Sequence, residues 1–126
     1  MSTALRVSEA ASIGMHTMGV LAAHPDTAMT AGQIASRLNV SHAHLSKVLQ
    51  RLGRAGLVQS VRGPGGGFRL ARPAGEISLL SVYEAVEGPL SLTDCLLGHA
   101  RCEGGECILG GLLASVNRQF ADYLRK

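Results

Sequence analysis

The chain has 126 residues, 46% of them hydrophobic, which is enough for one modest core; with two Phe, two Tyr and no Trp, that core favours packed helices over a β-sandwich. No run approaches the roughly 20 apolar residues that cross a bilayer, and the N-terminus lacks an export signal, so we expect a cytoplasmic protein without membrane contact. The net charge is +3, but residues 27–75 hold seven of the twelve basic residues and none of the nine acids, which predicts a polyanion partner for that segment.

Three helices are predicted in the first 56 residues. The range 8–24 has apolar residues at helical spacing and ends before Pro25. Thr30, followed three residues later by Gln33, forms a capping box that predicts the start of a short second helix. Ser41 can cap a third helix. Its inward-facing residues are Leu45, Val48, Leu49 and Leu52.

Two short strands, at 57–61 and 68–71, are predicted next, joined by the loop RGPGGG at 62–67. Three consecutive glycines after a proline indicate a flexible loop tip without bulky side chains. Arg62 lies at the base of the loop, and Arg69 lies across the hairpin. A helix pair followed by a basic hairpin predicts a winged helix-turn-helix, in a fold that is mostly α with a small β-hairpin wing.

The remaining chain predicts a short helix over 78–86, a loop over 91–107 and a long C-terminal helix from Ile108. In that last helix apolar residues recur at spacings of three and four, over a length of about 27 Å. Such a stripe needs a cover, and a second copy of the chain is the simplest one. We therefore divide the chain into a DNA-binding domain, 1–76, and a region for the cysteine loop and dimerisation helix, 77–126.

The second helix of such a pair enters the major groove with its N-terminal residues at base edges, while the wing reaches the backbone or the minor groove. We therefore expect Arg62 in the minor groove, where the negative potential is enhanced. Arg51 faces either phosphate or water. The alternative is that these are solvated charges and that the helix pair only packs. The candidate DNA-binding residues are Ser41, His42, His44, Ser46, Lys47, Arg51, Arg62, Gly65 and Arg69.

All three cysteines, Cys95, Cys102 and Cys107, lie in the sequence DCLLGHARCEGGEC. Their odd number and the expected compartment argue against disulfides, and the lack of a CxxC pair weakens a zinc site. Three thiolates on a glycine-rich loop suit an iron–sulfur cluster, which usually takes four ligands. A metal-free thiol switch uses the same cysteines. An enzyme would need an ordered base and an oxyanion site, which His99 alone does not supply, so we expect no catalysis.

The stretch LSKVLQRLGRAGLVQSVRGPGGGFRLARP, residues 45–73, strongly resembles the Rrf2 family of bacterial winged-helix transcription regulators. The likeness continues through AGQIASRLNVS, SVYEAVEG and the cysteine window. The resemblance implies a homodimer that binds an imperfect palindrome in promoter DNA, with the C-terminal helices in contact. It also implies that the three cysteines and one further ligand hold a [2Fe-2S] or [4Fe-4S] cluster, which senses redox state, nitric oxide or iron–sulfur supply in a repressor.

The fourth ligand cannot be carried over from the two best-known branches of the family. The histidine of the iron–sulfur-assembly branch falls on Gly110, and the aspartate that the partner chain supplies in the nitric-oxide branch falls on Ser12. His16 lies one helical turn beyond Ser12, matches a histidine position of some family members and ranks first, from the same chain or its partner. The alternatives are Glu9, Glu103, Glu106, His99, and an open iron bound by water or a small thiol.

Overall fold

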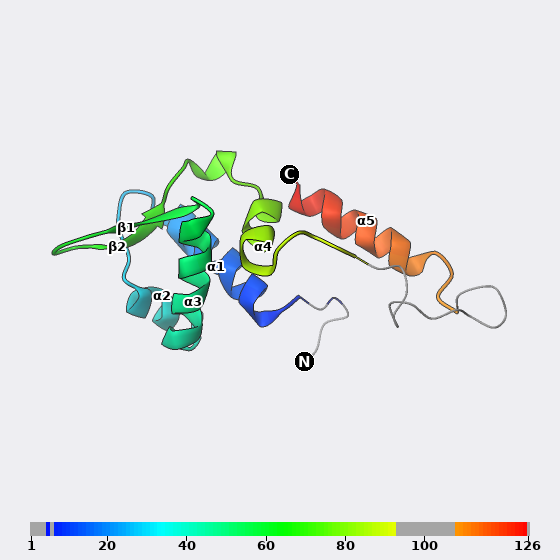
Figure 1. Ribbon diagram of the computed structural model, residues 1–126, viewed down its shortest axis with the longest axis horizontal. Helices are drawn as coiled ribbons and strands as arrows, with labels where there is room; N and C mark the ends of the chain where they lie inside the picture. Colours follow the sequence, from blue (N-terminus) through cyan, green and yellow to red (C-terminus); the bar gives the residue numbers. More distant parts are fainter. Residues whose placement is uncertain (1–4, 6, 93–107, 126) are drawn as a thin grey trace.

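The computed structural model describes residues 5, 7–92 and 108–125. It confirms a mostly helical fold with one small antiparallel hairpin. The wing projects from one side of a helical body, and the C-terminal helix lies on the other side (Figure 1). In chain order the elements are α1 (Glu9–Ala23), α2 (Ala31–Leu38), α3 (His42–Arg54), β1 (Val58–Val61), β2 (Gly67–Leu70), the one-turn helix η1 (Ala74–Glu76), α4 (Leu79–Glu87) and α5 (Leu112–Leu124).

Side-chain oxygens fix the starts of the first four α-helices. The predicted capping box at α2 is complete, because Thr30 Oγ1 accepts from Gln33 N at 3.1 Å while Thr30 N donates to Gln33 Oε1 at 2.9 Å. Ser41 Oγ accepts from His44 N at 3.2 Å and starts α3 as predicted. Ser8 and Ser78 cap α1 and α4 in the same way. Each cap satisfies a backbone N–H that has no acceptor within its own helix.

Helices α1, α3 and α4 meet at Gly14, in the middle of α1. A Cβ atom at this position would lie 3.0 Å from Val86, 3.6 Å from Val48 and 3.7 Å from Val82. The absent side chain therefore lets one helix pack closely against two others. The core around this junction consists of Ile13, Met18, Leu21, Met29, Ile34, Ala35, Leu45, Val48, Leu49, Leu52, Leu57, Val58, Val82 and Val86.

The root of the wing is bound to the segment that precedes α2. Strands β1 and β2 pair from Val58 opposite Leu70 to Val61 opposite Gly67. Phe68 also pairs with Met29, through hydrogen bonds of 2.9 and 2.7 Å between their backbones. A Cβ atom on Gly67, whose φ is +146°, would lie 2.4 Å from the carbonyl carbon and oxygen of Met29. Gly67 therefore allows the wing backbone to approach the Met29 backbone closely, a role different from the flexible loop tip predicted for the three glycines.

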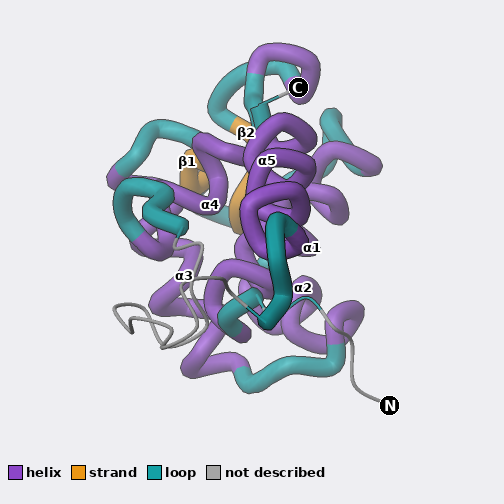
Figure 2. The backbone as a smooth tube through the Cα atoms, turned by 90° about the vertical axis from the view of Figure 1, so that its right-hand side faces the viewer, coloured by secondary structure: helices purple, strands orange, loops and turns teal. Residues whose placement is uncertain are grey.

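The C-terminal part of α5 packs against α4, and the start of the helix extends away from the helical body (Figures 1 and 2). The rings of Tyr83 and Phe120 meet edge to face, with centroids 6.3 Å apart. The helix begins at Leu112 rather than at Ile108 as predicted, because residues 108–111 form a turn in which Gly110 has a φ of +57°. No helix in the described part of the chain has the length and apolar character that spanning a membrane requires.

Replacing Gly67 with alanine is predicted to detach the wing root from Met29, because the new methyl group occupies the space of the Met29 carbonyl. We expect Gly67→Ala to lower the free energy of unfolding by at least about 2 kcal/mol in urea titration. Gly75→Ala is the matched control, since a Cβ atom at Gly75 meets nothing within 4 Å. Equal stability of the two variants would contradict the packing described for the wing root.

Candidate nucleic-acid interface

The outer face of α3 combines basic and polar side chains, and the helix contains no acid. Its inner face, which includes Leu45 and Leu52, is buried in the core, so the polar face of α3 points to solvent. On the outer side, Ser41, His42 and Lys47 are exposed, whereas His44 and Ser46 are half-buried. The predicted readers at the start of α3 therefore lie on an accessible surface. The positive end of the helix dipole adds to the attraction for anions there.

A groove of about 490 Å³ runs between α3 and the wing. Ser46 lies in it, together with Gln50 from α3 and with Gln59 and Ser60 from β1. The other residues that line the groove are Leu49, Gly53, Val58 and Phe68. Amide and hydroxyl groups without a carboxylate suit a sugar–phosphate strand, since such groups supply many of the protein hydrogen bonds to DNA backbone. Gln50 was not among the predicted site residues. Its position four residues after Ser46 places it on the same face of α3, and this spacing could have identified it.

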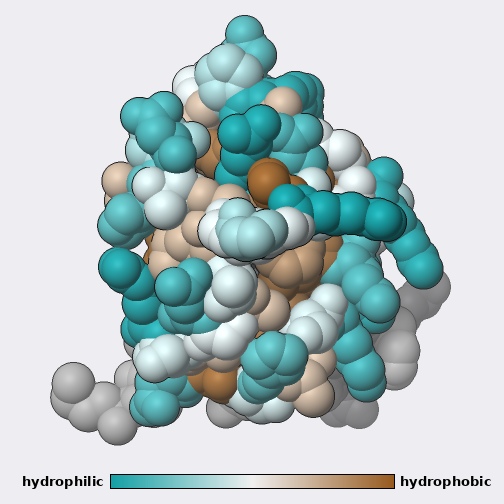
Figure 3. All heavy atoms as spheres, turned by 90° about the vertical axis from the view of Figure 1, so that its left-hand side faces the viewer, coloured by the Kyte–Doolittle hydropathy of each residue, from teal (hydrophilic) through white to brown (hydrophobic). Residues whose placement is uncertain are grey.

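The wing presents Arg62, Gly65 and Arg69 beyond this groove. Arg62 is exposed at the end of β1, and Gly65 has a φ of +74°, a conformation that favours glycine. Arg69 lies opposite Gln59 in the strand register. When the Gln59 amide oxygen faces Arg69, it accepts from Nε at 2.9 Å and from Nη2 at 3.2 Å, which leaves the other guanidinium hydrogens available. Seen from the wing side, hydrophilic side chains cover much of the surface, with apolar side chains visible between them (Figure 3).

Two of the predicted DNA readers are already engaged within the chain. His44 Nδ1 lies 3.5 Å from Glu9 Oε1 at the start of α1. Arg51 Nη1 donates to the backbone carbonyl of Val86, near the end of α4, at 2.7 Å. These contacts attach the recognition helix to its two neighbouring helices. No local sequence pattern predicts these contacts, because the residues in contact are 35 positions apart in each case.

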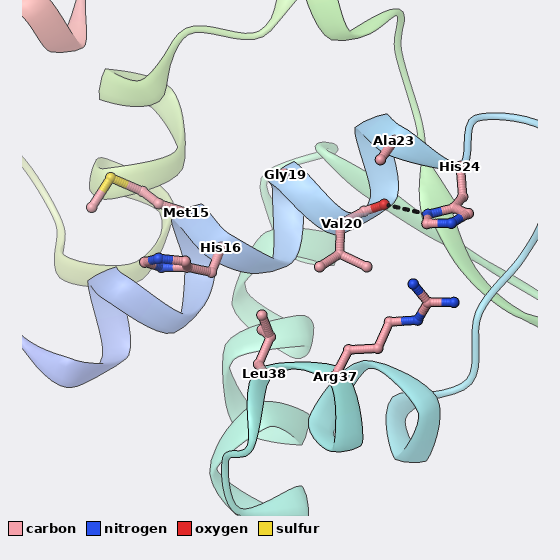
Figure 4. Close-up of a pocket in the computed structure, with 8 residues that line it drawn as sticks. All are labelled: Met15, His16, Gly19, Val20, Ala23, His24, Arg37 and Leu38. Atoms are coloured by element: carbon pink, nitrogen blue, oxygen red, sulfur yellow. Dashed lines mark hydrogen bonds between the residues drawn. The ribbon is translucent and has the colours of Figure 1, made fainter.

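His16, the first-ranked fourth ligand, is exposed on α1 at the rim of a groove of about 510 Å³ between α1 and α2. Figure 4 shows His16 beside Met15 at one end of this groove, and Arg37 with His24 at the other. The Nδ1 atom of His16 lies 2.7 Å from the Ser12 carbonyl oxygen, which can only accept, so Nδ1 carries the proton. In the neutral ring, Nε2 is then the nitrogen with the lone pair that a metal ion would need.

The predicted cluster ligands Cys95, Cys102 and Cys107 lie outside the described residues, as do His99, Glu103 and Glu106. Among the residues that the structure does describe, no three histidine, cysteine or carboxylate side chains gather closely enough to hold a metal ion. Of the candidate ligands, His16 and Glu9 are described. His16 has the donor chemistry that a soft metal site accepts, and Glu9 faces His44.

A model of the Rrf2 family, described as iron-dependent transcriptional regulator, matches residues 7–126. The HTH-type transcriptional regulator IscR of Vibrio atlanticus is 37% identical over 92 residues, which are 72% of this chain and 53% of that protein. The sequence matches cover 53–62% of the length of the curated relatives. These relatives are regulators of transcription rather than enzymes, in agreement with the prediction from sequence.

Two solved structures extend the comparison over nearly the whole chain. IscR of T. potens has a TM-score of 0.73 and 27% identity, and the match covers 97% of this chain and 81% of that one. The oxidized form of Staphylococcus aureus CymR has a TM-score of 0.74 and 25% identity, with 97% and 90% coverage. Both likenesses agree with a fold of helices and a small wing.

Proposed function

The chain belongs to the Rrf2 family of transcriptional regulators, and from this premise we propose that it binds an imperfect palindrome in promoter DNA and represses transcription. The observation that carries this proposal is the surface formed by α3 and the wing, which presents basic and polar side chains from a segment without acids. Such a surface attracts a polyanion. Half of the residues that line the groove between α3 and the wing carry uncharged polar groups, which suit one DNA strand.

The proposed arrangement places the start of α3 in the major groove. There Ser41, His42 and Ser46 approach base edges, while Lys47 and the wing residue Arg69 approach phosphates. Arg62 enters the neighbouring minor groove, and Gly65 lets the wing backbone come close to the DNA. His44 reaches the DNA through the nitrogen that does not face Glu9. Arg51 was expected to face phosphate or water, but because its guanidinium donates to the Val86 carbonyl, we assign it no phosphate contact in this arrangement.

A homodimer is part of the proposal, because two recognition helices on one DNA face match a palindrome when they lie about 34 Å apart. Helix α5 supports this assembly, because large apolar side chains on it are exposed to solvent. Leu112 is 55% exposed and Tyr123 is 64% exposed. Val116, one turn after Leu112, is 36% exposed. A second copy of α5 would cover these side chains. In this division of the chain, 1–76 binds DNA and 77–126 supplies the sensor and the dimer contact.

We further propose that Cys95, Cys102, Cys107 and His16, from the same chain or its partner, hold an iron–sulfur cluster. The family description as iron-dependent supports this assignment, as does the free Nε2 of His16. A bound cluster supplies a centre that nitric oxide, oxygen or peroxide can damage. The protein's own part is to hold the ligands on the segment between α4 and α5. A change there can alter how the two DNA readers are presented.

A metal-free thiol switch is the second candidate, because a protein of the same fold has been solved in an oxidized form. In this alternative peroxide oxidises one cysteine thiolate to a sulfenic acid, and a second cysteine condenses with it to form a disulfide and release water. The DNA-binding part of the proposal is the same in both cases. The two candidates differ in whether the reduced protein contains iron and sulfide.

Arg62→Ala is predicted to weaken binding to the operator by about 1–3 kcal/mol and to relax the sequence preference next to the wing, because a side chain is removed from the minor groove. Arg118→Ala is the control, since it removes the same charge from an exposed position on α5. Fluorescence anisotropy with labelled duplexes measures both variants. Operator affinity equal to that of the unaltered protein would remove Arg62 from the minor groove.

Protein purified without oxygen is predicted to be coloured and to contain iron and sulfide in stoichiometric amounts.

His16→Ala should change the visible and paramagnetic resonance spectra or shorten the lifetime of the cluster. His24→Ala is a matched control, because His24 also directs Nδ1 at a carbonyl four residues earlier, at 3.0 Å. Identical spectra for the two variants would exclude His16 as a ligand. Colourless, iron-free protein made with ample iron would favour the thiol switch.

A further inference from the structure

Polar contacts join α1, α3 and α4 pairwise, and we call these three contacts the triangle. Ser8 at the start of α1 donates to Glu87 at the end of α4. Arg51 of α3 donates to the carbonyl of Val86 in the last turn of α4. Glu9 of α1 faces His44 of α3. Each pair of helices therefore has one polar contact in addition to its apolar packing.

The contact between Arg51 and Val86 supplies a hydrogen-bond donor that α4 itself lacks. The Val86 carbonyl lies in the last turn of α4, where the usual donor four residues later would be Leu90 N. That donor is used elsewhere, because Leu90 N binds Glu84 Oε2 at 2.9 Å. Arg51 supplies the missing donor at 2.7 Å and places a cation at the negative end of the α4 dipole. Because Val86 is 4% exposed, loss of Arg51 would leave its carbonyl short of a partner.

The other two sides hold the N-terminus of α3 through α1. Ser8 Oγ accepts from Ala11 N at 3.1 Å while its hydroxyl hydrogen goes to Glu87, so one side chain starts α1 and ties it to α4. The next residue, Glu9, reaches His44 in the first turn of α3. His44 and Arg51 are seven residues apart, or about 10 Å along the helix axis. The recognition helix is thus held at two points, two turns apart.

We propose that Glu9, Arg51 and Glu87 are positioning residues, which select DNA sequence by fixing the tilt of α3 without contacting bases themselves. This inference rests on the proposed DNA-binding function. Hydrogen bonds to base edges tolerate only a few tenths of an ångström and a limited range of angles, so a tilt of α3 weakens them first. Binding to any sequence depends on charge and tolerates such a tilt. Loss of the triangle should therefore lower sequence selectivity and leave general DNA binding intact.

The sign of the charge change separates positioning from direct contact. Removal of the Glu87 carboxylate takes a negative charge away, so electrostatics alone would make every duplex bind more tightly. Positioning predicts weaker binding of the preferred duplex in the same variant. For Arg51 the salt dependence separates the two roles. If Arg51 contacts a phosphate directly, Arg51→Ala would reduce the magnitude of the slope of log affinity against log salt by about 0.9 for every duplex. Positioning by Arg51 predicts an unchanged slope with random duplex.

The experiment uses the full-length chain, a duplex selected by that chain from a random pool, and a random duplex of equal length. Affinity for both is measured over a series of salt concentrations for Glu87→Ala, Arg51→Ala and Glu9→Ala. In each variant we expect the affinity for the selected duplex, divided by the affinity for the random duplex, to fall at least about fivefold. Glu76→Ala is the control for charge, since Glu76 is exposed on η1, and its ratio should stay unchanged.

Two conservative variants guard against a merely structural effect. Glu87→Gln keeps an acceptor for Ser8 without the charge and should restore the ratio of the unaltered protein, and Arg51→Lys keeps one donor for Val86 and should restore part of it. Urea unfolding of each variant shows whether it is folded. If an alanine variant is not folded, the affinity ratio of the conservative variant at the same position tests the proposal instead. An unchanged ratio in Glu87→Ala and Arg51→Ala would overturn the proposal. So would a lower salt slope on both duplexes for Arg51→Ala. If the unaltered chain selects no duplex, the proposed function itself fails.

Discussion

The close approach of α1 to α3 and α4 at Gly14 is the constraint on which the rest of the structure depends. A methyl group at this position would lie 3.0 Å from Val86, closer than an ordinary van der Waals contact, so glycine lets α1 come this near to α4. The apolar face of α3 is fixed by this packing, and its polar face is therefore turned outwards. The wing follows α3 directly and is bound at its root through Phe68 to Met29, just before α2. Recognition helix and wing thus share one rigid base.

This base also brings α4 into the DNA-binding part of the molecule. The proposed division at residues 76 and 77 assigns α4 to the second part, yet α4 packs against both α1 and α3. The segment that carries the cysteines starts a few residues after α4 ends, at a turn held by Glu84 and Arg51. Along the sequence, the segment proposed to carry the sensor therefore follows the turn that Glu84 and Arg51 hold.

Local signals in the sequence predicted most of the fold. The capping box at Thr30 and the cap at Ser41 identified the helix pair, because both bonds join residues three positions apart. The hairpin followed from its strand pattern and glycine loop. Contacts between distant residues were not predictable: nothing in the sequence directs Arg51 to Val86 or pairs Gln59 with Arg69. The start of α5 was placed four residues too early, because the apolar stripe continues through a turn that two adjacent glycines favour. The role of the cysteines came from composition and family resemblance alone.

The most direct test of the account is a crystal structure of the full-length chain on its selected duplex. The account predicts that the first turn of α3 lies in the major groove, that one DNA strand fills the groove between Ser46 and Ser60, and that Arg51 still donates to the Val86 carbonyl. A complex in which α3 faces away from the DNA would contradict it. So would one in which Arg51 has left Val86 to bind a phosphate.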